Sequence, residues 1–227
     1  MALGVKICGL KTPEAMAAAL DARADFVGLV FFPPSPRHVT FDAAAELANQ
    51  ARGNAKIVAL TVDAEDALLD RIVEHVSPDM LQLHGSESPA RVAEIRGRYG
   101  RAVMKAIKVA TAADAAQALL YRDAADLILF DAKPPKGAIL PGGNGVAFDW
   151  TVLGRVKDQV PFMLSGGLDG TNVADAIRAT RPMAVDVSSG VETAPSVKDP
   201  TLIRAFIAAA RAPTAAAHTP PSSESQS

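Results

Sequence analysis

Val5-Lys6-Ile7-Cys8-Gly9 is typical of a short strand that ends in a turn, and it contains the only cysteine of the chain. Side chains alternate along a strand, so Lys6 and Cys8 share one face, while Gly9 permits the turn. Free cysteines are most often small buried apolar residues, and this stretch taken alone allows that interpretation. The alternative is a reactive thiol, which needs exposure and a neighbouring cation such as Lys6.

The same unit, a short apolar run followed by an alanine-rich amphipathic segment, recurs as far as about Arg211. Strands are predicted at residues 5–8, 26–31, 56–61, 80–83, 103–107, 126–130, 161–164 and 183–187. Helices are predicted at residues 13–23, 42–52, 64–75, 88–99, 112–121 and 199–211, and two more begin near Asp149 and Asp169. Parallel strands need crossovers, usually helices, so this alternation predicts a parallel sheet. Eight such units in 227 residues favour a (β/α)8 TIM barrel over a doubly wound open sheet.

Composition indicates one globular domain and a tail. We expect residues 1–211 to form the barrel and residues 212–227, rich in Thr, Pro and Ser, to be disordered. The chain is 49% hydrophobic and 21% charged with a net charge of −2, so nucleic acid is not an expected partner. No apolar run is long enough to span a bilayer, and no signal peptide is recognisable. One cysteine fits a reducing compartment, and we expect a cytoplasmic protein.

In a barrel the active site lies where the strands end, and reactive side chains gather at those positions. Glycine and serine turns follow the last two predicted strands, where barrels often bind phosphate; they contain Gly166, Gly167, Ser188 and Ser189. Glycine lets backbone N–H groups approach an anion, and the start of the following helix favours negative charge. We therefore predict a phosphate site there.

Cys8 and Asp131 end strands on facing sides of the predicted barrel mouth. Together they could supply a base and an acid to a sugar phosphate, although acids in pockets are also often structural. Arg37 follows a proline-rich loop at the same end and suits bidentate binding of a carboxylate; a solvated surface arginine is the alternative. Asp63 could be a helix cap.

Three further polar residues are predicted in or near the barrel mouth. Gln82 and His84 share one face of their strand, and His84 could contact substrate or be structural. Asp186 points into the barrel if Val185 and Val187 face the helices, and we expect it to pair with Lys6.

Metal and dinucleotide chemistry find little support. The four histidines have no ligand spacing and there is no cysteine pair, so no metal site is predicted. No G-x-G-x-x-G turn follows a strand, and no cofactor is expected. Gly142-Gly143-Asn144-Gly145 follows a long loop instead and is interpreted as a flap over the site.

Eight segments form a recognisable series along the chain. They are Lys6-Ile7-Cys8-Gly9, Phe32-Pro33-Pro34-Ser35-Pro36-Arg37, Leu81-Gln82-Leu83-His84-Gly85, Phe130-Asp131, Gly142-Gly143-Asn144-Gly145, Phe148-Asp149-Trp150, Leu164-Ser165-Gly166-Gly167-Leu168 and Asp186-Val187-Ser188-Ser189-Gly190-Val191-Glu192. In this order they resemble the phosphoribosylanthranilate isomerases, and the resemblance covers the chain from about Val5 to Arg211.

The resemblance implies an Amadori rearrangement of N-(5-phosphoribosyl)anthranilate in tryptophan biosynthesis, without metal or cofactor. Asp131 would be the general acid on the ring oxygen, and Cys8, as a thiolate, the base at C2′. Arg37 would hold the anthranilate carboxylate and the last two turns the phosphate. Monomers and homodimers both occur on this scaffold, and both remain open.

Two kinds of alternative remain. Another isomerase or epimerase on this scaffold would want metal ligands, or an aspartate where Cys8 stands. A catalytically idle barrel that binds a phosphorylated metabolite is the alternative outside enzymology, and the presence of both Cys8 and Asp131 argues against it.

Overall fold

The computed structural model describes residues 3–133 and 148–212. The predicted flap at residues 142–145 and the predicted tail beyond residue 212 lie outside these ranges.

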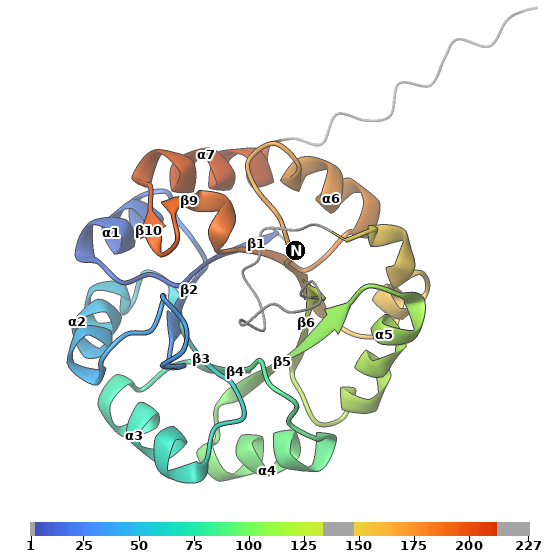
Figure 1. Ribbon diagram of the computed structural model, residues 1–227, viewed down its shortest axis with the longest axis horizontal. Coiled ribbons are helices and arrows are strands. Elements are labelled where there is room, and N and C mark those ends of the chain that lie inside the picture. Colours follow the sequence, from blue (N-terminus) through green and yellow to red (C-terminus); the bar gives the residue numbers. More distant parts are fainter. Residues whose placement is uncertain (1–2, 134–147, 213–227) are drawn as a thin grey trace, which may run out of the picture.

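Eight parallel strands close into a barrel in chain order, with β1 paired to both β2 and β8 (Figure 1). The strands are β1 Gly4–Cys8, β2 Phe26–Val30, β3 Lys56–Thr61, β4 Met80–Leu83, β5 Ala102–Val109, β6 Leu127–Ala132, β7 Phe162–Leu164 and β8 Ala184–Val187. The predicted TIM barrel is confirmed. β6 extends past the predicted end at Phe130, so Asp131 belongs to the strand itself.

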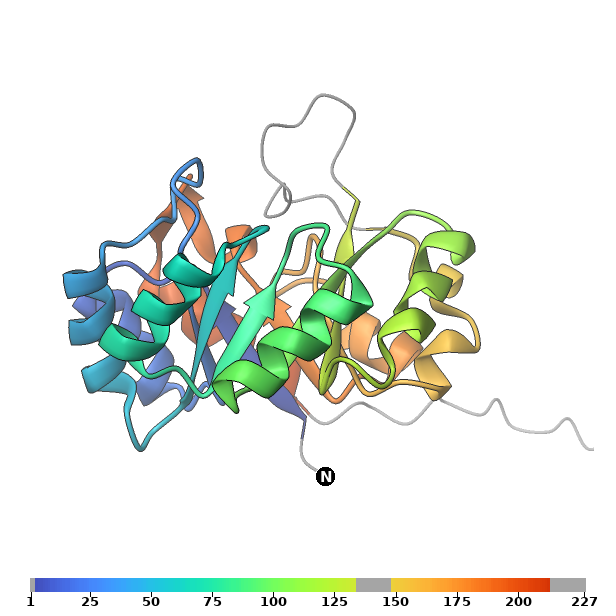
Figure 2. The same ribbon diagram turned by 90° about the horizontal axis from the view of Figure 1, so that it is seen from below.

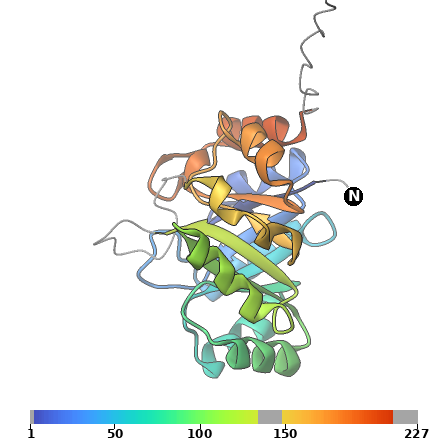
Figure 3. The same cartoon turned by 90° about the vertical axis from the view of Figure 1, so that its right-hand side faces the viewer.

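Helices surround the barrel as an outer ring, seen end-on in Figure 1 and from the side in Figure 3. They are α1 Pro13–Asp21, α2 Phe41–Ala51, α3 Asp66–Val76, α4 Pro89–Tyr99, α5 Ala112–Ala116, α6 Val173–Thr180 and α7 Pro200–Arg211. The segment after Asp149 differs from prediction, because two 3-10 turns, Trp150–Leu153 and Val156–Asp158, replace the expected helix. Gly154 separates these turns with φ 44°, a conformation that ends helical geometry. Among the described residues, no helix combines the length and apolar character that a membrane crossing requires.

Two apolar layers hold the barrel together. Side chains such as Val58, Met104 and Leu129 fill its interior, while residues such as Ile7 and Val27 point outward and pack under the helices. Because side chains alternate along each strand, the inward-facing positions that hold apolar side chains such as Met104 continue as polar side chains near the strand ends.

Aspartates clamp the starts of the odd-numbered strands. The carboxylates of Asp25, Asp79 and Asp126 lie just before β2, β4 and β6. They accept hydrogen bonds from the backbone N–H of the second residue of the preceding strand, at 2.8, 2.7 and 2.8 Å respectively. Met183 occupies the equivalent position before β8, so this clamp is absent there. The clamps lie at the amino ends of the strands.

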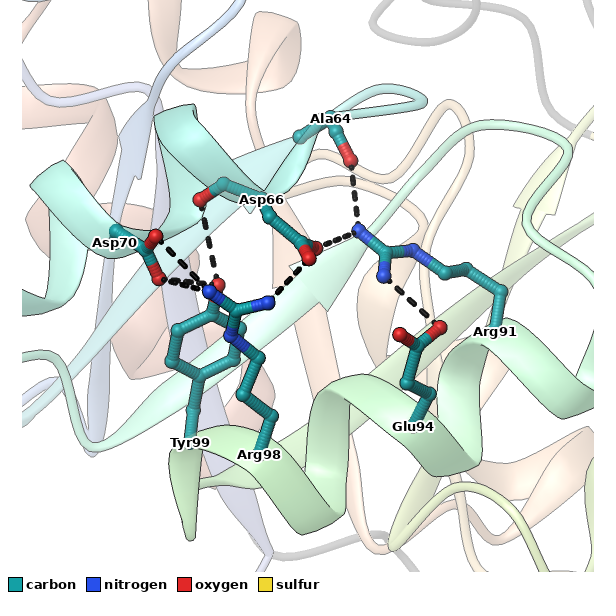
Figure 4. A network of polar contacts seen from close by, with 7 residues as sticks. All are labelled: Ala64, Asp66, Asp70, Arg91, Glu94, Arg98 and Tyr99. Atoms are coloured by element: carbon teal, nitrogen blue, oxygen red, sulfur yellow. Dashed lines mark hydrogen bonds and ion pairs between the residues drawn. The ribbon is translucent and has the colours of Figure 1, made fainter.

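Arginines of α4 join α3 through an ion-pair network on the outer surface (Figure 4). Arg91 Nη2 lies 2.5 Å from Asp66 Oδ1, and Arg98 pairs with both Asp66 and Asp70. Tyr99 also donates its hydroxyl to Asp70 at 2.8 Å. The network stabilises the packing of neighbouring helices and lies on the outside of the barrel.

A short hairpin between β8 and α7 was not predicted. It consists of β9 Glu192–Ala194 and β10 Val197–Lys198, and it follows a 3-10 turn at Ser189–Val191. In Figure 2 the strands of the barrel run toward one end of the molecule, where their following loops gather. The hairpin adds two buried charged side chains, Glu192 and Lys198, to that end.

Candidate active site

Cys8 lies at the carboxyl end of β1 and is 4% exposed. Gly28 of the neighbouring strand makes room for it: a Cβ there would lie 2.9 Å from Cys8 Sγ and 3.2 Å from Lys6 Nζ. The thiol and the ammonium therefore lie against the same glycine, on the shared face that strand alternation predicts. Lys6 Nζ also contacts Asp186 Oδ1 at 2.8 Å, and the predicted Lys6–Asp186 pair is confirmed.

The cations near Cys8 offset only part of the effect of burial on the pKa of its thiol. Burial raises the pKa of the Cys8 thiol, whereas the Lys6 and Lys198 ammonium groups lower it, and the net change is upward. Burial also disfavours the Lys6 ammonium, but the Asp186 carboxylate and Cys8 more than compensate, so the pKa of Lys6 lies above its ordinary value. Lys6 is thus a fixed cation beside the thiol.

Asp131 lies at the carboxyl end of β6, separated from β1 by β7 and β8. It is 5% exposed, and both of its carboxyl oxygens contact polar groups. Oδ1 accepts from the Ala132 backbone N–H at 3.0 Å, and Oδ2 lies 3.2 Å from His84 Nε2. This contact places a carboxyl group and an imidazole side by side.

Gln82 completes this group from the inner face of β4. Its Nε2 lies 3.1 Å from His84 Nδ1, which fixes the ring between the amide and Asp131. Within residues 3–133 and 148–212, Gln82 Oε1 is buried and has no hydrogen-bond partner. A buried acceptor without a donor is costly, so a hydroxyl donor that reached this atom would stabilise it.

Asp186 links Ser165, which follows β7, to Lys6 on β1. Ser165, just after β7, donates its hydroxyl to Asp186 Oδ2 at 3.0 Å, while Asp186 Oδ1 holds Lys6. Asp186 is 5% exposed on the inner face of β8. Its carboxylate is therefore occupied on both oxygens by protein groups.

The turns predicted to bind phosphate lie at this same end. Gly166 and Gly167 have φ of 86° and 66°, and a Cβ on Gly166 would lie 2.4 Å from the Ala132 nitrogen, so only glycine fits there. The N–H groups of Gly166 and Gly167 meet no acceptor among the residues that the structure describes. Ser188 donates its hydroxyl to the Cys8 carbonyl at 3.2 Å, and Ser189 begins the next 3-10 turn. The unpaired N–H groups can receive an anion.

Arg37 is buried, 6% exposed, and lies over the turn after β1, where a Cβ on Gly9 would come within 2.7 Å of its Cδ. It pairs with Glu192 through two 2.8 Å hydrogen bonds, from Nε and Nη2. The alternative of a solvated surface arginine is wrong.

Sequence reasoning missed Glu192 and Lys198 as functional candidates. Lys198 Nζ contacts Glu192 Oε1 at 2.7 Å and the Ser188 carbonyl at 2.9 Å. Two signals were present: Glu192 ends the last of the segments that resemble the family, and both charged residues follow closely after the Ser188-Ser189-Gly190 turn.

Asp63 is structural, but it does not cap α3, whose N-cap is Glu65. Its Oδ1 accepts from the Ser86 N–H at 2.6 Å, and its own N–H donates to Glu87 Oε1 at 2.9 Å. Glu87 in turn pairs with the buried Lys105 at 2.8 Å. These contacts brace the loop that follows His84.

In the described ranges, no three histidine, cysteine, aspartate or glutamate side chains are placed to hold a metal ion together.

Comparison with known proteins gives a consistent result. The family model described as N-(5'phosphoribosyl)anthranilate (PRA) isomerase matches residues 5–209. An N-(5'-phosphoribosyl)anthranilate isomerase of Rhodopseudomonas palustris strain BisA53 is 63% identical over 212 residues, covering 93% of this chain and 97% of the relative. One of Bradyrhizobium sp. strain ORS 278 is 60% identical over the same shares.

Solved structures agree. The phosphoribosyl anthranilate isomerase of Thermotoga maritima superposes with a TM-score of 0.84 at 34% identity, covering 92% of this chain and 99% of that one. A phosphoribosyl anthranilate isomerase in complex with reduced 1-(o-carboxyphenylamino)-1-deoxyribulose 5-phosphate has a TM-score of 0.81 at 33% identity, with the same coverage.

Proposed function

Because this chain belongs to the N-(5'-phosphoribosyl)anthranilate isomerase family, we propose that Cys8 and Asp131 are the general base and general acid of its reaction. The chain is an isomerase of tryptophan biosynthesis. Its proposed substrate is N-(5-phosphoribosyl)anthranilate, and its proposed product is 1-(2-carboxyphenylamino)-1-deoxyribulose 5-phosphate.

The proposed reaction begins at Asp131. Its carboxyl proton passes to the furanose ring oxygen, the C1′–O bond breaks, and the nitrogen lone pair forms a Schiff base at C1′. The Cys8 thiolate then removes the proton from C2′, and the electron pair moves toward nitrogen to give an enolamine. Tautomerisation to the ketone completes the step. C2′ is oxidised and C1′ is reduced within one molecule, so the reaction needs no external redox cofactor.

The observation that carries this proposal is the placement of Cys8 and Asp131. Both are buried at the carboxyl end of the barrel, on strands separated by two others. Cys8 lies beside Lys6 of its own strand, and Asp131 contacts His84, which follows β4. An acid and a base on separate strands can reach two positions of one sugar. A thiolate base needs cationic help, and Lys6 lies beside it.

The other site residues are proposed to bind substrate. Arg37 suits the anthranilate carboxylate because a guanidinium fork matches carboxylate geometry. Gly166, Gly167, Ser188 and Ser189 are proposed to hold the phosphate. In the described part of the chain the N–H groups of the two glycines meet no acceptor, which supports this role. Gln82 Oε1 has no hydrogen-bond partner among the described residues, which supports a contact with a sugar hydroxyl. His84 and Asp186 are proposed to orient the substrate together with the groups they contact.

Steady-state turnover tests the acid–base pair, with substrate generated in place and followed by the loss of its anthranilate-type fluorescence. Cys8→Ala and Asp131→Asn should each lower kcat by about 10²–10⁴-fold, the usual contribution of one general acid or base. Activity that survives Cys8→Ala would remove the thiolate base from the mechanism. A folded but inactive wild type would instead support a barrel that only binds a phosphorylated metabolite.

A further inference from the structure

The β9–β10 hairpin presents a carboxylate to the residue proposed to bind substrate. Glu192, with a side chain only 4% exposed, accepts from Arg37 Nε and Nη2 at 2.8 Å each. Burial disfavours both charges, but their pairing raises the pKa of Arg37 and lowers the pKa of Glu192. Both groups are therefore charged in the folded protein, and the guanidinium has a fixed orientation.

The shape of the guanidinium decides what this pairing leaves free. Arginine has five N–H donors in a rigid plane, and the side edge made by Nε and Nη2 is used by Glu192. The end formed by Nη1 and the second hydrogen of Nη2 can still bind another carboxylate in the same bidentate manner. In the parts of the chain that the structure describes, Glu192 is the only side-chain acceptor that the Arg37 guanidinium contacts.

Glu192 is itself held from other directions. Lys198 Nζ donates to its Oε1 at 2.7 Å, and the Ser196 N–H donates to Oε2 at 3.1 Å. Lys198 also donates to the carbonyl and hydroxyl oxygens of Ser188, at 2.9 and 3.2 Å. Because the carboxylate is anchored to the hairpin and to the turn after β8, it can serve as a fixed support.

The charges of this cluster point to an anionic ligand. Two buried cations, Arg37 and Lys198, share the single carboxylate of Glu192, so the three groups together carry one excess positive charge. An unbalanced buried charge is costly, and a substrate carboxylate would neutralise it. Gly9 allows the arginine to lie directly over the turn that follows Cys8.

We propose that Glu192 is a positioning residue for substrate recognition: it fixes the side edge of Arg37 so that the free end binds the anthranilate carboxylate. This inference rests on the proposed role of Arg37. Glu192 acts through Arg37 and does not itself touch the substrate. The opposite role, a competitor that Arg37 must leave before substrate binds, predicts the opposite change in KM.

The test compares two substrates that differ only in the carboxylate: N-(5-phosphoribosyl)anthranilate and N-(5-phosphoribosyl)aniline, with product measured by chromatography. Glu192→Gln should raise KM for the first by about tenfold or more, as expected for loss of a charge-assisted contact, with a smaller change in kcat. For the aniline substrate, KM should be the same in variant and wild type. Glu74→Gln, on an exposed side chain of α3, is the matched control and should change neither substrate.

Three results would overturn the proposal. Equal losses on both substrates would make Glu192 a purely structural residue, and a lowered KM for the anthranilate substrate would make it a competitor. Arg37→Met tests the role of Arg37 separately from that of Glu192. If Arg37→Met affects both substrates alike, Arg37 does not bind the substrate carboxylate, and the role of Glu192 fails with it. Glu192→Asp keeps the carboxylate but moves it away from Arg37, because its side chain is shorter. This variant should also raise KM only for the anthranilate substrate, and it replaces Glu192→Gln if that variant does not fold.

Discussion

At Cys8, burial and the surrounding ammonium groups act on the thiol in opposite directions. Burial raises the pKa of Cys8 and dominates, while Lys6 and Lys198 lower it. A free thiol has an ordinary pKa of about 8.5, so the resting enzyme near neutral pH holds Cys8 mainly as the thiol. The proposed base is therefore a minor form whose population depends on nearby cations.

Replacing Lys198 should change that population. Lys198→Met removes a cation that lowers the pKa of the Cys8 thiol, so this pKa should rise further in the variant. Lys198→Arg keeps the charge and should leave the pKa closer to that of the wild type. The chain has one cysteine, so the rate of alkylation by a small iodoacetamide reagent as a function of pH reports Cys8 alone. An unchanged profile in Lys198→Met would show that this cation does not act on the thiol.

At the scale of elements, the strand-start aspartates hold successive strands in register. Each accepts a charge-assisted hydrogen bond from a backbone N–H of the preceding strand, and such bonds contribute about 1.5–3 kcal/mol. Asp25 has a second contact, 3.1 Å from Arg211 at the end of α7, so it also connects the first and last units of the barrel.

Asp79→Ala should lower the free energy of unfolding by about 1.5–3 kcal/mol, because the Ile57 N–H loses its acceptor. Denaturant unfolding measures the change. Asp21→Asn, at an exposed position of α1, is the control and should stay within about 0.5 kcal/mol of wild type. Equal effects of the two substitutions would show that the clamp contributes nothing specific.

The buried Lys105–Glu87 pair should matter more for stability than the surface network of α3 and α4. Glu87→Gln breaks a 2.8 Å pair whose side chains are 2% and 3% exposed, and should cost about 3–5 kcal/mol. Asp66→Asn, in the exposed network of Figure 4, should lower the free energy of unfolding by less than Glu87→Gln, and high salt should remove the effect. Denaturant unfolding of both variants measures the two losses, and an equal or larger loss in Asp66→Asn would contradict the prediction.

The effect of Glu87 should also depend on pH. Burial raises the pKa of Glu87, but Lys105 lowers it further, so its folded value lies below the unfolded value of about 4.3. Its contribution is therefore fully present above that pH and is lost as pH falls through the folded value. The stability difference between wild type and Glu87→Gln should shrink below about pH 4. A difference that grows on acidification would contradict this account.

At the scale of the whole molecule, the alternation of strand and helix segments along the sequence predicted the barrel, and the residues at the predicted strand ends predicted most of the site. Alternation placed Lys6, Cys8 and Asp186 on inward faces, and the barrel rule put Asp131, Arg37 and the glycine turns at one end. The Arg37–Glu192 contact joins residues 155 positions apart through an unpredicted hairpin, so no local pattern could reveal it. The same holds for Asp63, whose partners belong to the loop after β4. A monomer or a homodimer remains the prediction for assembly.

The division of the chain into a barrel and a tail remains a prediction, and truncation tests it. A chain that ends at Ala212 keeps all of α7. The truncated chain should keep kcat/KM within about twofold and its Tm within about 2 °C of the full chain, because the composition of the removed residues does not support a core. A large fall in Tm would show that those residues belong to the folded domain.

The most direct test of the proposed thiolate base is the pH dependence of kcat/KM beside a titration of Cys8 itself. The ultraviolet absorbance of the thiolate, with Cys8→Ala subtracted as the blank, gives the pKa of the only cysteine. Because kcat/KM reports ionisations of the free enzyme, it should rise with pH at the same midpoint as the thiolate, above the ordinary value of about 8.5. A kcat/KM that stays flat while Cys8 ionises would contradict the assignment of Cys8 as the base.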